Sequence, residues 1–421
     1  MRQRVNNAEV VGRDLFCGGM ITLPFSEVGE ASWTAAKHDI VTKNDSIVSF
    51  RSGGGLAAAA DAVAAERRQG ATTILFASTS YDLAALGREL ALRGVDRAVG
   101  AATGRVISAE GFAAEGVSGF HLPPRRFAAA DTLLEDVAGM ALPELRSRVH
   151  RLRRELDEIR ESALEHCFAI LLADAESRCE ERLAGVLGME LSGVPLIGGS
   201  AGDLYFNPLG HPPGSTRLLY HGTAKRAAAV LCLVASASPV AAYCHNHYMP
   251  SDKKMVITDA DPARRVVREI DGRPALEVYA AACGFRKAPR ESRDFAPFPL
   301  MIRIGGHYYA RGMQRIYPDG ALEFACALEP GLVVALGRPG DMIASLEGLF
   351  STMRRRIGAP DLVIGVDCAA RTAYMEREGL TKGIEALLRR NSVTGFSSLG
   401  EQFNTVHANN SFTCLGVASA A

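Results

Sequence analysis

The chain has 421 residues, 48% of them hydrophobic and 22% charged, a balance typical of globular proteins and a length that predicts two or three domains. Its 47 basic residues match 47 acidic ones, so there is no net charge to attract nucleic acid or a membrane surface. The apolar stretches fall short of a clean membrane span, and the first 16 residues contain no apolar core of a signal peptide. We therefore expect a cytoplasmic protein that binds neither nucleic acid nor membrane.

The nine cysteines are scattered, odd in number and without a CxxC pair. This pattern argues against a disulfide framework and against a zinc ribbon. Most of them lie in apolar segments, as Cys232 does in "AVLCLVAS" and Cys326 in "EFACAL". We expect them to be small buried side chains in a reducing compartment.

The N-terminal half begins with residues 1–45, which show little pattern and are expected to form a lead-in. From residue 46, short apolar runs alternate with helical patterns that close on glycine, as at Gly70 and Gly94. This alternation predicts α/β layering. The predicted strands are 46–52, 71–78, 96–104, 116–123, 167–175 and 226–238, and the predicted helices are 54–70 and 82–94.

Residues 142–165 form the clearest predicted helix. A single apolar stripe recurs at steps of four and three, while the other face is dense in Arg and Glu; the stripe consists of Leu145, Val149, Leu152, Leu156 and Ile159. A partner-binding or dimerising helix would show this pattern, but so would a helix on its own sheet, and we favour the sheet. A homodimer remains open.

The second half reads differently from about residues 215–225 onward. Strands and hairpins predominate, and "PDG" at 318–320 is a predicted turn. We predict a mixed α+β protein of two layered α/β domains: 46–220 with alternating strands and helices, and 221–421 rich in strands with flanking helices. In the second domain the predicted strands are 253–261, 264–272, 299–306, 307–325, 331–340, 360–371 and 411–419, and the predicted helices are 273–284, 342–358 and 381–391.

A glycine-rich turn follows the predicted strand in "GVPLIGGSAGD" at 193–203. It lacks the GK[ST] ending of a phosphate-binding loop, and it is neither G-x-G-x-x-G nor G-x-S-x-G. Ser200 and Asp203 offer polar atoms there, and Cys368 lies near Arg371, but neither pair has a base at a recognisable spacing. We therefore do not expect an enzyme.

Three further motifs follow in order. They are "DGRPALEVY" at 271–279, "CAAR" at 368–371, and "GFSSLGEQFNTVHANNSFT" at 395–413, which we interpret as a turn, a His-Ala-Asn-Asn corner and a strand. Together with "GGSAGD", their order and spacing resemble the FIST sensory family, whose members have an N-terminal and a C-terminal FIST domain. The resemblance implies signal transduction and small-ligand sensing.

Within that family the segment "CHNHYMPSDKKMVITDAD", from residue 244, resembles the nitric-oxide-sensing haem proteins. That subgroup acts on a partner histidine kinase or a cyclic-di-GMP enzyme. The resemblance implies haem b as cofactor, nitric oxide as ligand and a partner of one of these two kinds.

Two histidines, His245 and His247, are the leading haem ligands in this interpretation. In an extended segment they point to the same face, so one ligates iron while the other stays nearby. Tyr248 would contribute to the wall, and Arg264 and Arg265 would pair with the propionates. Local hydrogen bonding at a strand end explains the same pair without haem, and we leave both explanations open.

His407 in "TVHANN" is the rival iron ligand. It also belongs to a haem-free alternative, in which the two polar motifs form a pocket for a small metabolite. The residues of that pocket would be Ser200, Asp203, Glu401, His407 and Asn409.

Overall fold

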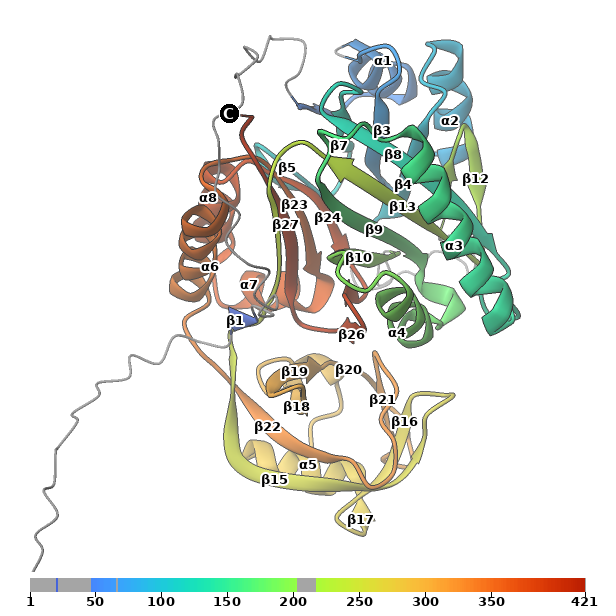
Figure 1. Ribbon diagram of the computed structural model, residues 1–421. Helices are drawn as coiled ribbons and strands as arrows, with labels where there is room; N and C mark the ends of the chain where they lie inside the picture. The colour runs from blue at the N-terminus through green and yellow to red at the C-terminus, as the bar shows by residue number, and fades with distance from the viewer. Residues whose placement is uncertain (1–19, 22–46, 66, 203–216, 421) are drawn as a thin grey trace, which may run out of the picture.

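The computed structural model describes residues 20–21, 47–65, 67–202 and 217–420. It confirms a mixed α+β fold, in which a large body of three sheets lies above a smaller unit (Figure 1). The predicted lead-in, 1–45, lies outside the described residues apart from one short strand, β1 (Met20–Ile21).

The first sheet of the body has the order β12-β11-β4-β3-β7-β2. All seven residues of β3 are buried, as its continuous apolar run predicts. Helix α1 (Leu56–Ala65) packs beside α2 (Leu83–Leu92), which begins where the Asp82 carboxylate accepts the backbone N–H groups of Ala84 and Ala85. The strands are β2 (Val48–Ser52), β3 (Thr72–Ser78), β4 (Ala98–Thr103), β7 (Val117–Leu122), β11 (Leu218–Tyr220) and β12 (Thr223–Lys225).

The second sheet has the order β26-β25-β10-β9-β13-β8 and is covered by helices α3 (Leu142–Ile159) and α4 (Glu180–Glu190). The stripe of α3 is buried against the leucines of this sheet, so α3 lies on its own sheet, as we expected; only Ile159, the last residue of the helix, is exposed. The strands are β8 (Phe127–Glu135), β9 (His166–Asp174), β10 (Leu196–Ala201), β13 (Ala228–Ser236), β25 (Glu401–Phe403) and β26 (Val406–Ala408), and a short 3-10 helix, η2 (Ala175–Ser177), follows β9.

The third sheet has the order β1-β14-β27-β23-β24-β5-β6. Three helices pack on it: α6 (Met342–Ile357), α7 (Ala369–Arg377) and α8 (Thr381–Arg390). Its remaining strands are β5 (Val106–Ser108), β6 (Gly111–Ala113), β14 (Val240–His245), β23 (Pro360–Cys368), β24 (Val393–Ser398) and β27 (Phe412–Ala418).

Two sequence predictions are wrong in this sheet. The segment predicted as a turn in "GFSS" is the buried strand β24, which runs parallel to β23. The strand predicted over 360–371 ends at Cys368, and "AAR" is instead the first turn of α7. Gly395 of β24 packs directly against the backbone of Gly365 in β23. A glycine is present there because the two strands approach closely, and not because the chain turns.

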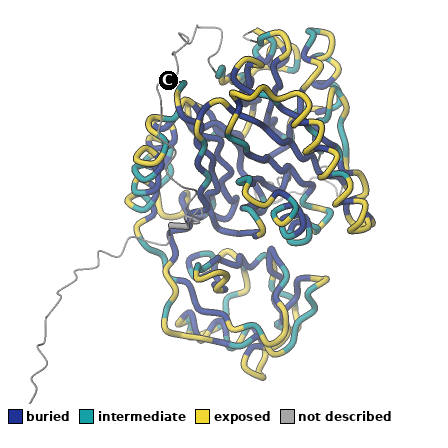
Figure 2. Tube along the Cα trace, in the orientation of Figure 1, coloured by how far each residue is buried: buried dark blue, intermediate teal, exposed yellow. Residues whose placement is uncertain are grey.

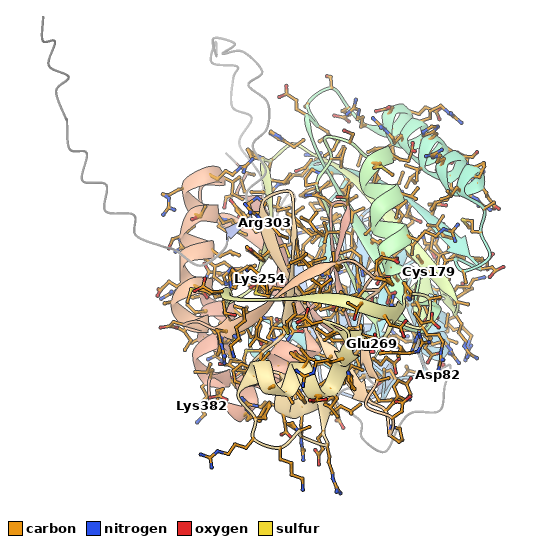
Figure 3. All side chains as sticks on the ribbon, turned by 90° about the horizontal axis from the view of Figure 1, so that it is seen from below. Asp82, Cys179, Lys254, Glu269, Arg303 and Lys382 are labelled. Carbon is orange, nitrogen blue, oxygen red and sulfur yellow. The ribbon has the colours of Figure 1, made fainter. Side chains whose placement is uncertain are left out.

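The smaller unit, residues 248–339, lies between β14 and α6, and we call it the inserted unit. Its curved sheet has the order β19-β18-β22-β15-β16-β21-β20, with β17 paired to β16. Seen from below, Lys254 marks β15 at the middle of this sheet and Arg303 marks β18, next to one edge (Figure 3). Its elements are β15 (Tyr248–Asp261), β16 (Val266–Ile270), β17 (Arg273–Pro274), α5 (Ala275–Cys283), η3 (Ser292–Phe295), β18 (Leu300–Ile304), β19 (His307–Arg311), β20 (Met313–Ile316), β21 (Leu322–Phe324) and β22 (Val333–Pro339).

Hydrogen-bonded strands cross the expected domain boundary at 220 in both directions. Strand β25 pairs with β10 in the second sheet, and β5 pairs with β24 in the third. One large apolar cluster extends through these sheets and into the inserted unit, and Figure 2 shows the buried strands at the centre of the body. Among the helices of the described residues, none is both long and apolar enough to cross a membrane.

We predict that Gly395→Ala destabilises the body by about 2 kcal/mol or more, because the new methyl group would collide with the carbonyl oxygen of Gly365 in a packed interior. The measurement is the free energy of unfolding in urea. Gly185→Ala is the matched control, since a methyl group there meets no atom within 4 Å and alanine favours the helix. Equal stability of the two variants would contradict the close strand packing described here.

Candidate functional site

The inserted unit meets the body at three places, which together form the candidate site. The first is a cavity between its β19–β20 segment and the start of α7. The second is an ionic cluster with α4, and the third is the pair of chain segments that lead into and out of the unit at His247 and Gly340.

The cavity has a volume of about 250 Å³ including its open mouth, while its interior has room for about one water molecule. The body supplies the start of α7 and the His-Ala-Asn-Asn corner, and the inserted unit supplies the opposite wall. The lining residues are Gly312, Met313, Gln314, Ala325, Cys368, Ala369, Ala370, Leu399, Asn409 and Asn410.

Two amide side chains give the cavity its polar character. The side-chain oxygens of Asn409 and Asn410 are buried and have no partner among the described residues. Asn410 has a φ of 51°, a left-handed conformation that asparagine tolerates better than most residues. Gly312 lies opposite it, and a Cβ there would lie 2.5 Å from the Asn410 oxygen, so the amide would have to move aside.

Cys368 lies at the point where β23 becomes α7. Its sulfur accepts the backbone N–H groups of Ala370 and Asn410, yet burial raises the pKa of the thiol well above its usual range. The thiol is therefore neutral and lines the cavity as a weak donor.

Glu401 lies behind Cys368 and is fully buried. Burial raises the pKa of its carboxyl group to about 8, although contacts with the serine hydroxyls lower it. The hydroxyls of Ser398 and Ser411 lie 2.5 Å and 2.6 Å from its two oxygens. Near neutral pH this carboxyl group is mostly protonated.

A chain of hydrogen bonds runs behind the cavity through residues of the metabolite-pocket alternative. Ser200 lies 3.3 Å from a Glu180 oxygen, and Gln402 donates to the Ser200 hydroxyl at 3.0 Å. The imidazole of His407 lies between the amides of Gln402 and Asn409, at 3.4 Å and 3.5 Å. The structure thus brings Ser200, Glu401, His407 and Asn409 into one region, although only Asn409 of these four lines the cavity, and Asp203 lies outside the described residues.

His407 is packed tightly in this chain. Burial lowers the pKa of the imidazole, and a Cβ on Gly400 would collide with its ring. Its two ring nitrogens face the NH₂ groups of Gln402 and Asn409, so the neutral ring accepts from one of these donors and belongs to the polar network.

The ionic cluster joins the inserted unit to α4. Arg265 lies 2.5 Å from Glu180 and 2.7 Å from Glu181, and it also donates to the carbonyl oxygen of Ala325. Arg178 pairs with Glu323 at 2.7 Å beside it. Arg265 is therefore engaged by protein carboxylates, while Arg264 lies exposed on the same turn. Neither contacts the two histidines that we predicted to bind haem.

The segment His245–Tyr248 and the fully buried Arg371 form the hinge between body and inserted unit. Arg371 pairs with Asp367 at 2.7 Å and approaches Nδ1 of His247 at 3.5 Å. The backbone carbonyl of His247 accepts the N–H of Gly340, which ties the entering and leaving segments together. Burial lowers the pKa of His245 to about 3 and that of His247 to about 2, so both are neutral.

Their hydrogen bonds assign the proton on each ring. The Ser345 hydroxyl donates to the carbonyl of Met342, so it accepts from Nε2–H of His245, which leaves a lone pair on Nδ1. Nδ1 of His247 faces the Arg371 guanidinium, so Nε2 of His247 carries the proton. His245 Nδ1 and His247 Nε2 have no partner among the described residues.

A haem does not fit these histidines as they are packed. Nδ1 of His245 has the right chemistry, but both side chains are at most 2% exposed. The ring of His247 lies 4.0 Å from that of Tyr248 and 4.9 Å from that of Tyr374, and a guanidinium occupies its other side. Neither histidine lines this cavity or the second pocket described below, and the described residues contain no group of three or more His, Cys, Asp or Glu that could hold a metal ion.

The sequence analysis did not identify the wall contributed by the inserted unit. Gly312 lies in the link between β19 and β20 and Gln314 lies in β20, and no distinguishing motif marks either. It also left Arg371 without a role, although "CAAR" is one of the motifs that carried the family resemblance. The available signal was an arginine that follows directly on the apolar run of β23, because a charged side chain in such a segment is buried only when it is paired.

The fold and the site define a mixed α+β protein with a polar cavity where an inserted unit meets its body. Two family models match the chain in order, the FIST N domain over residues 71–273 and the FIST C domain over 275–404. The chain therefore belongs to the family of FIST-domain sensory proteins, whose domains act in signalling. No curated protein matches it significantly.

We predict that Glu401→Gln flattens the dependence of stability on pH. Because the folded pKa of about 8 exceeds the ordinary value of 4.5, the folded state binds more protons between these pH values, and the free energy of unfolding of the wild type falls as pH rises through them. The contribution of this group is up to about 1.4 kcal/mol per pH unit. Urea unfolding at a series of pH values measures it, and parallel wild-type and variant curves would contradict a protonated Glu401.

Proposed function

We propose that this protein is a signalling sensor that binds a small polar molecule in the cavity between α7 and the inserted unit. The observation that carries the proposal is the pair of buried, unpartnered amide oxygens of Asn409 and Asn410 at this junction. Buried polar atoms of this kind need a donor, which a ligand or water must supply.

The ligand that suits this site is small and carries hydrogen-bond donors, such as an amine or amide. The start of α7 offers the opposite chemistry, because the first N–H groups of a helix have no partner within it. A molecule that carries hydrogen-bond donors next to an acceptor would donate to the amide oxygens of Asn409 and Asn410 and accept from the N–H groups at the start of α7.

Binding is coupled to movement in this proposal. The interior holds about one water molecule, so a larger ligand must move Gly312–Gln314 away from α7. That wall belongs to the inserted unit, which is also held by the ionic cluster at Arg265 and by the hinge at His247. A ligand that binds the open arrangement better than the closed one shifts the position of the whole unit.

The altered position of the unit is the signal that a partner reads. Following the family resemblance, we propose a histidine kinase or a cyclic-di-GMP enzyme as the partner, and a cytoplasmic setting. The role in this proposal is non-enzymatic.

We predict that small polar metabolites which raise the melting temperature lose affinity in Asn410→Ala by about 3- to 10-fold, because one hydrogen bond is lost. Gly312→Ala should weaken the same compounds, since its methyl group displaces the Asn410 amide. A thermal-shift screen followed by titration calorimetry makes the measurement.

Asn391→Ala is the matched control for that experiment. It also removes a buried amide, but one that caps α8 and contacts Arg354, away from the cavity lining. Compounds that bind the Asn410 and Gly312 variants as tightly as the wild type would contradict the proposed site.

The second candidate is a haem-based nitric oxide sensor, as the subgroup resemblance implies. The observation in its favour is that Nδ1 of His245 is buried and has no partner among the described residues. The hinge would have to unpack to admit the cofactor.

We predict that the purified protein titrated with haem shows no Soret band that depends on the hinge histidines. The reason is the close packing of His247 against Tyr248, Tyr374 and Arg371. The measurement is an absorption spectrum with and without nitric oxide for wild type, His245→Ala and His247→Ala. A Soret band lost in either variant would overturn our ranking and establish the haem sensor.

A further inference from the structure

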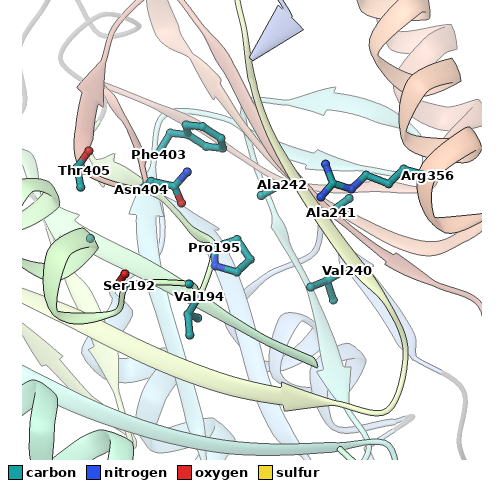
Figure 4. A pocket seen from close by; sticks show the side chains of 12 residues that line it. Ser192, Val194, Pro195, Val240, Ala241, Ala242, Arg356, Phe403, Asn404 and Thr405 are labelled. Atoms are coloured by element: carbon teal, nitrogen blue, oxygen red, sulfur yellow. The ribbon is translucent and has the colours of Figure 1, made fainter. Parts of the chain in front are cut away.

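A second pocket lies on the body, away from the inserted unit, with a volume of about 820 Å³ including its open mouth and interior room of about 240 Å³ (Figure 4). It is bounded by the loop after α4, strand β14, the end of α6 and the turn between β25 and β26. The lining residues are Gly188, Ser192, Gly193, Val194, Pro195, Val240, Ala241, Ala242, Arg356, Phe403, Asn404 and Thr405. It shares no residue with the cavity of the proposed function.

The walls of this pocket are mainly apolar and firmly held. Val194, Pro195 and Ala242 are only half-buried, so their apolar surfaces face the open space. The turn at Asn404 is fixed to β10, since its N–H donates to the carbonyl of Leu196 and its side-chain oxygen accepts the N–H of Leu196. Glycine at 188 allows this turn to pack directly on α4.

Two polar side chains face this apolar space. The oxygen of the Asn404 amide is already used by Leu196, so the group it can offer a ligand is its NH₂ donor. Arg356 extends from α6 toward Ala241 and Ala242 (Figure 4). Both side chains are therefore donors, and one of them is positively charged.

Arg356 differs from its neighbours at the end of α6. Arg354 donates to Asn391 and Arg355 to Thr352. Arg356 is exposed and forms no ion pair with a carboxylate of the described residues. Burial raises the pKa of the Tyr243 phenol, and the Arg356 guanidinium lies close enough to offset part of this rise. A cation on an apolar wall that lacks a protein counter-ion favours an anion from solution.

We propose that this pocket binds a small organic monocarboxylate with an apolar body, such as an aromatic acid. The carboxylate would accept from Arg356, and the apolar body would cover Ala242, Pro195 and Val194, with the Asn404 amide at the opposite side of the pocket (Figure 4). One guanidinium suits a single carboxylate, and the volume suits a body the size of a benzene ring. This site is independent of the proposed sensor cavity.

The test is calorimetric titration of the full chain with benzoate and with benzamide, its neutral counterpart. We expect benzoate to bind with a Kd of about 1 mM or tighter. Arg356→Gln should weaken benzoate about 10-fold or more and leave benzamide unchanged, because the lost hydrogen bond is charge-assisted. Arg355→Gln is the matched control, since it removes an exposed arginine of the same turn that does not line the pocket.

Further variants separate this site from the sensor cavity. Ser192→Trp, at an exposed position on the rim, should block benzoate, and Asn410→Ala should leave benzoate binding within twofold of the wild type. Absence of benzoate binding, equal binding of benzamide, or equal losses in Arg355→Gln and Arg356→Gln would each overturn the proposal. None of these outcomes bears on ligands of the Asn410 cavity.

Discussion

The buried ion pair of Arg371 and Asp367 is the constraint on which the rest of the site depends. Both side chains are inaccessible to solvent, and removing one partner of such a pair costs about 3–5 kcal/mol because the other charge is left unpaired. The pair spans the junction between β23 and α7, so it fixes where the helix begins. That position places Cys368, Ala369 and Ala370 at the cavity, and it places the guanidinium against His247 in the hinge.

This arrangement gives the two sides of α7 different tasks. One side forms the cavity wall opposite Gly312, and the other supports the segment through which the inserted unit is attached. If the inserted unit separated from the cavity wall, the backbone at the hinge would have to change conformation. Several buried polar atoms of this hinge have no hydrogen-bond partner among the described residues: Nε2 of His247, Oδ2 of Asp367 and one nitrogen of Arg371. Buried polar groups without partners hold a packed arrangement weakly, so the hinge is suited to change conformation.

Sequence reasoning succeeded where local pattern decides structure. The stripe of α3 and the apolar runs of β3 and β9 are buried as predicted, because each buries its apolar side against a neighbouring layer. Sequence reasoning failed at β24, because the small residues that allow close strand packing there are also typical of turns. The inserted unit was also invisible, because no change of composition marks the points at Tyr248 and Pro339 where the chain leaves and rejoins the body.

The candidate site was predictable only in part, because its decisive contacts join distant residues. Glu401, Asn409 and His407 share one short motif and lie in one region of the structure, but Arg265 meets Glu180 across 85 positions and Arg371 meets His247 across 124. An H-x-H pattern is expected in a strand that binds a metal, but it also occurs here where the chain passes from the body into the inserted unit. At His245 and His247 a cation, two tyrosine rings and a serine hydroxyl surround the imidazoles, and these contacts account for both as neutral packing groups.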